Sequence, residues 1–224
     1  MNLIEREDAV LIEPTATARA SVIWLHGLGA DGHDFAPMVP ELGLPKDAGV
    51  RFIFPHAPVR PITINNGLAM RGWYDIKSLT KMALQDDAGI RESERIVHGY
   101  LDHEIAAGTP AEKIVLAGFS QGGAITLHTG TRYPKRLAGL MALSTYLPLS
   151  DKFSAEVKRE RKDTPVLMCH GSFDPMLPMA LGTTSRDLLK AEGFEVSWHE
   201  YPMAHQVCEE EIELIGNWLK QRLL

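Results

Sequence analysis

Short apolar runs separated by turn residues dominate the pattern of the chain. Four runs are apolar at every position, and glycine or proline follows each within two residues: 22–25, 52–54, 114–117 and 166–169. Such continuous hydrophobicity is typical of a strand buried on both faces, as in a parallel sheet between layers of helices. Residues 137–143 and 196–201 are two further strand candidates.

Helical periodicity lies between these runs. Apolar residues share one face of residues 87–107, and Gly108 is placed to end that helix. Apolar residues also recur at steps of three and four from Cys208 to Leu219, with three glutamates in the first turn and Lys220 and Arg222 in the last, as the helix dipole favours. This alternation predicts one three-layer α/β domain over residues 1–224, with a mostly parallel sheet.

The composition narrows the class of protein. The 224 residues are 45% hydrophobic, and 23 basic against 29 acidic side chains give a net charge of −6. We expect a soluble globular protein without nucleic acid as a partner, because phosphate binding needs a concentrated basic surface. The two cysteines, Cys169 and Cys208, are expected to be free thiols. With acids at its start and no apolar run of ~20 residues, the chain is expected in the cytoplasm, without an integral membrane segment.

The strongest chemical signal is Gly118-Phe119-Ser120-Gln121-Gly122, between the predicted strand 114–117 and a helical segment that Pro134 is expected to end. Gly-x-Ser-x-Gly at a strand-to-helix junction is the nucleophile elbow, whose sharp turn exposes the serine hydroxyl above the sheet. No phosphate-binding glycine pattern competes with it. We therefore expect Ser120 to be a nucleophile.

A serine hydroxyl needs a neighbouring imidazole to take its proton. On the fold that carries this elbow, the histidine follows the last strand. His205 lies in the loop before the final helix, whereas His199 lies inside a predicted strand and His170 precedes a turn glycine. We therefore expect His205 to be the base.

A carboxylate must orient that imidazole, and it is expected between the serine and the histidine along the chain. Asp174 lies in a turn after the strand 166–169, and Pro175 stiffens this turn. Asp151 and Asp163 are rivals by order, but neither directly follows a strand run, so we expect them to be solvated loop charges.

An oxyanion needs two N–H donors. The residue after the nucleophile, Gln121, supplies one, and the loop after an early strand supplies the other. The segment His26-Gly27-Leu28-Gly29 follows the strand 22–25, and we assign the second donor to the backbone of Leu28. His26 is expected to support this loop rather than to react.

One long irregular segment, residues 58–85, is expected either to contact substrate or to be a surface excursion. Its apolar positions Ile62, Ile64, Leu68 and Met70 could form a pocket wall or a subunit contact.

Six segments in this order resemble the small carboxylesterases of the phospholipase/carboxylesterase family, which includes bacterial carboxylesterases and eukaryotic acyl-protein thioesterases. The resemblance runs from about Ser21 to the C-terminus. The segments are LHGLGADGHDF (25–35), PHAP (55–58), RGWYD (71–75), GFSQGGA (118–124), LSTYLP (143–148) and HGSFDP (170–175).

This resemblance implies an α/β-hydrolase fold without a large cap, no cofactor or metal, and an acyl pocket lined by Trp73 and its neighbours. It also implies that homodimers are common. Ala204 stands where the family usually has glycine before the histidine, and Met176 and Leu177 replace two small β-branched residues. We expect Met176 and Leu177 to contact substrate and to reshape the pocket without changing the chemistry.

The sequence thus predicts a serine carboxylesterase that acts on small-molecule esters of short to medium acyl chains. Two alternatives stay open on the same site: an acyl-protein thioesterase and a lysophospholipase. A noncatalytic binding module is the remaining alternative, and it would be expected to lack a member of the triad.

Overall fold

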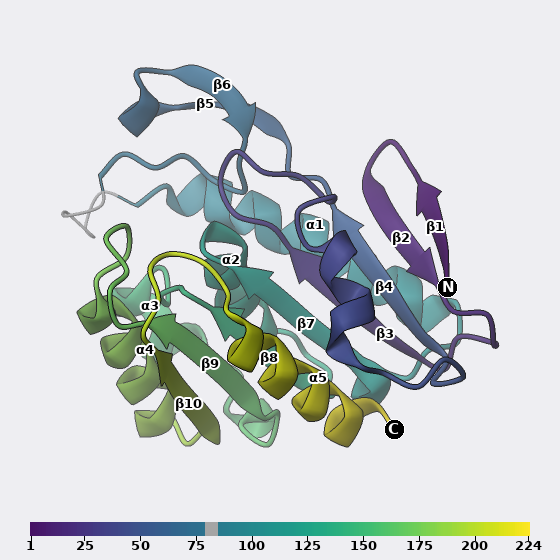
Figure 1. Ribbon diagram of the computed structural model, residues 1–224. Helices are drawn as coiled ribbons and strands as arrows, with labels where there is room; N and C mark the ends of the chain where they lie inside the picture. The colour runs from purple at the N-terminus through teal and green to yellow at the C-terminus, as the bar shows by residue number, and fades with distance from the viewer. Residues whose placement is uncertain (79–84) are drawn as a thin grey trace.

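The computed structural model describes residues 1–78 and 85–224 and centres on one large sheet (Figure 1). In the described part of the chain this sheet has eight strands in the order β1-β2-β4-β3-β7-β8-β9-β10. The strands are β1 (Asn2–Glu5), β2 (Ala9–Glu13), β3 (Ala20–Leu25), β4 (Val50–Pro55), β7 (Ile114–Phe119), β8 (Gly139–Leu143), β9 (Val166–Gly171) and β10 (Val196–Tyr201).

The strands from β4 to β10 pair with one another in parallel, and the antiparallel pairs among the described strands of this sheet are β1–β2 and β2–β4. The prediction of a mostly parallel α/β sheet is therefore confirmed, and each of the four continuous apolar runs lies in a parallel strand. β1 was not predicted, because all four of its residues are exposed and it carries no burial signal.

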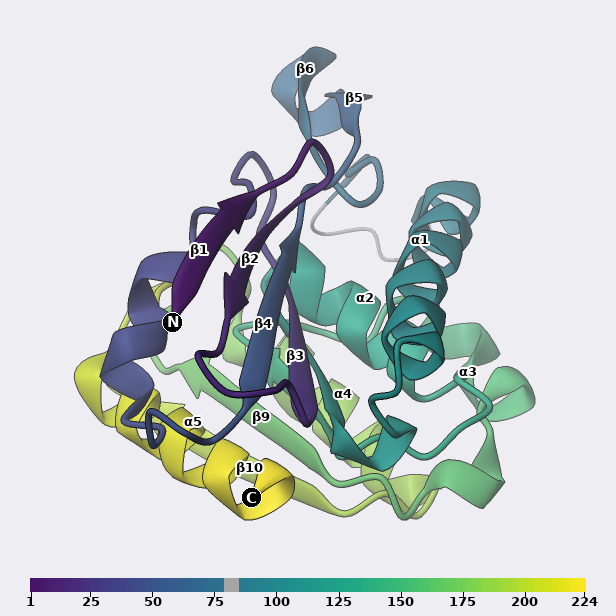
Figure 2. The same ribbon diagram turned by 90° about the vertical axis from the view of Figure 1, so that its right-hand side faces the viewer.

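Helices cover both faces of the sheet (Figure 2). Alternate side chains of one strand enter different cores: Ile23 and Leu25 lie in one, Val22 and Trp24 in the other. The first core is closed by α1 (Asp87–Ala106), α2 (Gln121–Gly130), α3 (Ser150–Glu156) and α4 (Met179–Ala191). The second core is closed by α5 (Glu209–Leu223) and the short helix η1 (Ala36–Leu42).

The helix ends follow the expected signals, with one exception. α1 ends at Ala106, and Gly108 has a φ of 104° just beyond it. α2 ends at Gly130, before the expected stop at Pro134. The Thr131 hydroxyl donates to the carbonyl of Leu127 at 2.7 Å and so satisfies a carbonyl of the last helical turn.

The segment expected to be irregular contains a small hairpin that projects above the sheet in Figure 1. Its strands are β5 (Val59–Ile62) and β6 (Leu68–Arg71), joined by the short helix η2 (Thr63–Asn65) and a turn with positive φ at Asn66 and Gly67. The rest of that segment includes residues 79–84, which lie outside the described part of the chain.

The cysteines and the membrane-spanning potential of the helices were also predicted from the sequence. Cys169 and Cys208 are free thiols. Among the helices in the described residues, none has the length and apolar character needed to cross a membrane.

Candidate active site

Ser120 lies at the sharp turn between β7 and α2. Its φ of 54° and ψ of −119° are strained for a residue with a side chain. A Cβ added at Gly118 or Gly122 would collide with the neighbouring backbone, that of Gly122 with the carbonyl of Leu25. The Thr145 hydroxyl donates to the Ser120 carbonyl at 2.6 Å and braces the turn. This is the geometry expected of a nucleophile elbow.

The structure brings the three expected side chains together. Nε2 of His205 lies 2.8 Å from Oγ of Ser120, and Nδ1 of His205 lies 2.6 Å from Oδ2 of Asp174. A carboxylate oxygen can only accept here, so the His205 Nδ1–H donates to Asp174 and leaves Nε2 free to accept the serine proton. The arrangement can therefore move a proton from Ser120 to His205.

The loop after β9 fixes the Asp174 carboxylate, and this side chain is fully buried. Its Oδ1 accepts the backbone N–H groups of Met176 and Leu177 at 2.8 and 2.9 Å. His170 is buried and its Nε2–H donates to the carbonyl of Leu177 at 2.8 Å, so it holds the same loop in place. The second oxygen of Asp174 is thereby left for His205.

Leu28 and Gln121 border the cavity in front of Ser120, as expected for the two oxyanion donors. Gln121 is the first residue of α2, and an N–H in the first turn of a helix has no acceptor within the helix. The loop around Leu28 is held by two backbone hydrogen bonds: the Gly29 N–H donates to the carbonyl of Arg71 at 2.8 Å, and the Ala30 N–H donates to that of Gly27.

His26 supports this loop from inside the protein. Its Nε2 accepts the Ala57 N–H at 3.0 Å, so the ring proton is on Nδ1 and donates to the carbonyl of Gly27 at 2.7 Å. Burial lowers the pKa of His26 to about 4, outweighing the backbone hydrogen bond to Gly27, which raises it. At neutral pH the ring is uncharged and can make both contacts.

Trp73 lies elsewhere than expected. Its side chain is fully buried, its Nε1–H donates to the carbonyl of His26 at 2.9 Å, and it is absent from the residues that line the cavity. The neighbouring Tyr74 lines the cavity instead. Trp73 therefore supports the Leu28 loop from behind, because its indole is buried and its N–H finds an acceptor in the carbonyl of His26.

The side chain of Gln121 has a contact that the sequence did not predict. Its Oε1 accepts the Trp73 N–H and its Nε2 donates to the Tyr74 carbonyl, both at 2.7 Å. A glutamine directly after the nucleophile was the available signal, but only the fold places residues 73 and 74 opposite it.

The cavity in front of Ser120 has a volume of about 410 Å³, which suits a medium-sized ligand. Met176 and Leu177 line it, as expected, and so do Ile64 and Met70 of the β5–β6 hairpin. The phenols of Tyr74 and Tyr146 lie 2.8 Å apart, and burial raises the pKa of both, so they stay neutral. The remaining lining residues are Gly27, Leu28, Ala30, Asp34, Asn65, Ile76, Phe119, Ser120, Gln121 and His205.

Within residues 1–78 and 85–224, no three His, Cys, Asp or Glu side chains gather as metal ligands would.

Comparison with known proteins gives one consistent result. A family model described as phospholipase/carboxylesterase matches residues 6–223. Acyl-protein thioesterase 1 of Neurospora crassa is 42% identical, with 100% of this chain and 95% of that protein aligned. Acyl-protein thioesterase 2 of Zea mays has a TM-score of 0.86 at 30% identity, covering 96% of this chain and 99% of that one. SOBER1 of Arabidopsis thaliana has a TM-score of 0.85 at 35% identity, covering 92% and 100%.

Proposed function

Because the chain belongs to the phospholipase/carboxylesterase family, we propose that it is a thioesterase that removes acyl groups from the cysteines of acylated proteins. As a member of this family with an α/β-hydrolase fold, it is a hydrolase of ester or thioester bonds. The preference for thioesters over simple carboxylic esters is the finer part of the proposal.

The observation that carries this preference is the match over the whole chain to a relative named acyl-protein thioesterase 1. The cavity supports it, because Ile64, Met70, Ile76, Met176 and Leu177 give it an apolar wall beside Ser120. An acyl chain gains about 0.8 kcal/mol for each CH₂ group that such a wall removes from water.

In the proposed first half-reaction, His205 takes the Ser120 proton as Oγ attacks the acyl carbonyl. The tetrahedral oxyanion is bound by the backbone N–H groups of Leu28 and Gln121, and each donor lowers the barrier by about 3 kcal/mol. When the intermediate collapses, the C–S bond breaks and the proton on His205 passes to the leaving thiolate. The products are the free cysteine thiol and an ester of Ser120.

In the second half-reaction, water takes the place of the thiol. His205 removes a proton from water, the hydroxide attacks the acyl ester, and His205 returns the proton to Oγ of Ser120 as the carboxylic acid leaves. Asp174 keeps the Nδ1–H of His205 in place and stabilises the imidazolium in both halves.

The test compares substrates on the purified protein. An S-octanoyl cysteine peptide and the matched O-octanoyl serine peptide separate thioester from ester preference, and lysophosphatidylcholine tests the lysophospholipase alternative. We expect kcat/KM to be roughly tenfold or more higher for the thioester than for the other substrates. A tenfold difference corresponds to about 1.4 kcal/mol of additional transition-state stabilisation. Equal or higher kcat/KM for the O-octanoyl serine peptide would return the assignment to a carboxylesterase.

A second experiment tests the nucleophile independently of substrate choice. A fluorophosphonate should attach to Ser120, and peptide mass spectrometry locates the adduct. The Ser120→Ala variant is the control and should remain unlabelled. No label on Ser120, while a known serine hydrolase in the same tube is labelled, would contradict the mechanism.

A further inference from the structure

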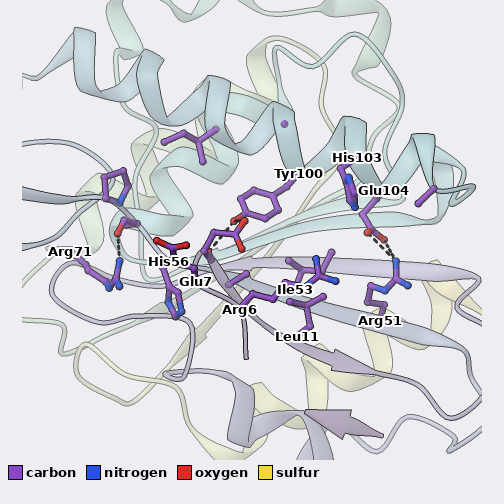
Figure 3. Close-up of a pocket in the computed structure, with 17 residues that line it drawn as sticks. Arg6, Glu7, Leu11, Arg51, Ile53, His56, Arg71, Tyr100, His103 and Glu104 are labelled. Atoms are coloured by element: carbon purple, nitrogen blue, oxygen red, sulfur yellow. Dashed lines mark hydrogen bonds and ion pairs between the residues drawn. The ribbon is translucent and has the colours of Figure 1, made fainter. Parts of the chain in front are cut away.

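A second hollow lies on the far side of the loop that carries Leu28. It has a volume of about 650 Å³, larger than the cavity in front of Ser120, and the two share no lining residue. Its walls are α1, strands β2 and β4 and the start of the β5–β6 hairpin. Figure 3 shows it as a groove, with Arg71 and His56 at one end, Arg51 at the other, and Leu11 and Ile53 along the floor between them.

The arginine at one end of this groove is paired with acids, whereas the arginine at the other end is not. At one end, Arg51 is paired with Glu13 and Glu104 at 2.9 and 3.0 Å. At the other end, Arg71 makes no ion pair with any residue in the described part of the chain, and its Nη1–H donates only to the carbonyl of Ala57, at 2.9 Å. A guanidinium has five N–H donors, so the Arg71 end retains donors and a positive charge for an anion.

The acidic side chains near the groove either accept hydrogen bonds from other residues or are exposed to solvent. Glu104 accepts from Arg51 and from the Ser21 hydroxyl, and the Asp8 carboxylate accepts the Tyr100 hydroxyl at 2.9 Å. Arg6, Glu7 and Asp8, from the turn between β1 and β2, also line the groove but are exposed, so water screens their charges. An apolar floor with an uncompensated cation at one end fits a ligand that has an apolar chain and one anionic group.

The Arg71 end is joined to the Leu28 loop by hydrogen bonds. The carbonyl of Arg71 accepts the Gly29 N–H at 2.8 Å, and the ring of His56 accepts the Gly32 N–H at 3.0 Å. The Ala57 N–H donates to His26 at 3.0 Å. Residues that line the groove therefore also hold the backbone on both sides of Leu28, which the proposed mechanism uses for the oxyanion.

We propose that this groove binds an amphiphilic carboxylate, with its carboxylate on Arg71 and its chain along Leu11 and Ile53, and that the bound ligand slows turnover at Ser120. An anion bound by the free N–H donors of Arg71 draws the guanidinium away from the carbonyl of Ala57 and so loosens the segment that supports His26. The binding part stands without the proposed function, whereas the effect on turnover depends on it. The acid released by ester or thioester hydrolysis belongs to the same chemical class, so the groove could report accumulated product.

The variant that isolates the groove is Gly99→Leu. Gly99 lines the groove from α1, and a Cβ there would meet nothing within 4 Å, so a leucine side chain can fill the space. Leucine is also the better helix former, which protects the fold of the variant. Arg71→Met removes the cation instead. Arg95→Met is its matched control, because Arg95 is an exposed arginine of α1 that does not line the groove.

Decanoate is the probe, with decanol as the neutral match. Isothermal titration should show two decanoate sites on the wild-type chain and one on Gly99→Leu, because the cavity at Ser120 still accepts the chain. Arg71→Met should weaken the second site roughly tenfold, the scale of one charge-assisted contact, and Arg95→Met should not. A single site on the wild-type chain, or a second site that decanol fills equally well or that both groove variants retain, would overturn the binding part.

Kinetics with a water-soluble short ester test the coupling. Decanoate should raise the apparent KM of both proteins by competing at Ser120, but it should lower kcat roughly fivefold only in the wild-type chain. Without decanoate, Gly99→Leu should have the wild-type kcat. A fall in kcat that Gly99→Leu shares, or a second site whose filling leaves kcat unchanged, would overturn the coupling. If no protein hydrolyses any ester or thioester, the proposed function fails while the titration result still stands.

Discussion

The side chain of Gln121 holds the backbone of Trp73: its Oε1 accepts the Trp73 N–H at 2.7 Å. The residue whose own N–H faces the proposed oxyanion thus also fixes the segment behind the acyl cavity. Since the indole of Trp73 in turn donates to the carbonyl of His26, one chain of contacts runs from the start of α2 to the Leu28 loop. The two proposed oxyanion donors are therefore mechanically connected.

Gln121→Ala should disturb this connection while leaving the backbone N–H in place. It leaves the buried N–H of Trp73 and carbonyl of Tyr74 without partners, at a cost of about 1–3 kcal/mol each. We expect a lower melting temperature and a lower kcat with fluorophosphonate labelling of Ser120 retained. Gln221→Ala, at an exposed position of α5, is the control. A variant as stable as Gln221→Ala would show that these two contacts are replaced by water.

Ser120→Ala and His205→Ala should each remove nearly all hydrolysis, and the double variant should be little worse than either. The two groups act as a unit, so the second substitution has almost nothing left to remove. Steady-state rates of the three variants, measured against the uncatalysed rate in buffer, test this. Losses that multiply in the double variant would mean that the two residues act independently.

Asp174→Asn keeps the shape of the loop but replaces the acceptor that holds the His205 Nδ1–H. An amide nitrogen facing Nδ1 favours the wrong tautomer, and we expect kcat to fall on the order of 10³ to 10⁴-fold. Asp163→Asn is the control, because Asp163 is an exposed loop acid paired with Arg136. A fall of less than tenfold would indicate that His205 keeps its orientation without Asp174.

His26 should make stability depend on acidity. Its pKa is about 4 in the folded chain and near 6.5 when unfolded, so the unfolded state binds the proton more readily as the pH falls between these values. The free energy of unfolding should drop by up to about 3 kcal/mol over that window from this group alone. Denaturation by urea at pH 7 and pH 4.5 measures it.

The matched variants for this experiment are His26→Gln and His33→Gln. His26→Gln should be less stable at pH 7 and should lose less stability on acidification. His33→Gln should not flatten the pH dependence, because hydrogen bonds to Asp31 and Glu5 raise the pKa of this exposed residue, which is the opposite direction. An unchanged slope in His26→Gln would refute the neutral, buried state of His26.

Glu211 should show the reverse dependence. Burial raises the pKa of its carboxyl from 4.5 to about 7, so the folded state favours the neutral form and loses that stabilisation as the pH rises from 4.5 through 7. Glu211→Gln should therefore raise the free energy of unfolding at pH 8 by up to about 3 kcal/mol and change it little at pH 5. The exposed neighbour variant, Glu210→Gln, should show no such gain, and a destabilised Glu211→Gln at pH 8 would contradict the prediction.

The parts of the fold that the sequence predicted are those in which burial alone decides the structure. The strand at 114–117 is buried throughout, and the helix starting at residue 87 buries one face along its length. The hydrophobic pattern therefore identifies both. β1 and the β5–β6 hairpin have few buried positions, and the sequence did not indicate them.

In the candidate site, too, some residues could be predicted from the sequence and others could not. Ser120, Asp174 and His205 could be placed because each follows a strand in the order that the elbow requires. Trp73 could not, since the direction of its indole depends on the turn after β6 and on an acceptor, the carbonyl of His26, 47 positions away. Backbone contacts between distant loops leave no periodic signal along the chain.

The loop with His205 leads directly into α5, and α5 closes the second core through Ile215, Trp218 and Leu219. Ser120 and Asp174 precede that helix along the chain and are translated first. A ribosome-bound chain therefore carries the proposed nucleophile and acid before the base has a scaffold to hold it. Hydrolytic competence should appear only after α5 has emerged from the exit tunnel and docked, which makes the reaction a late event in the biosynthesis of the protein.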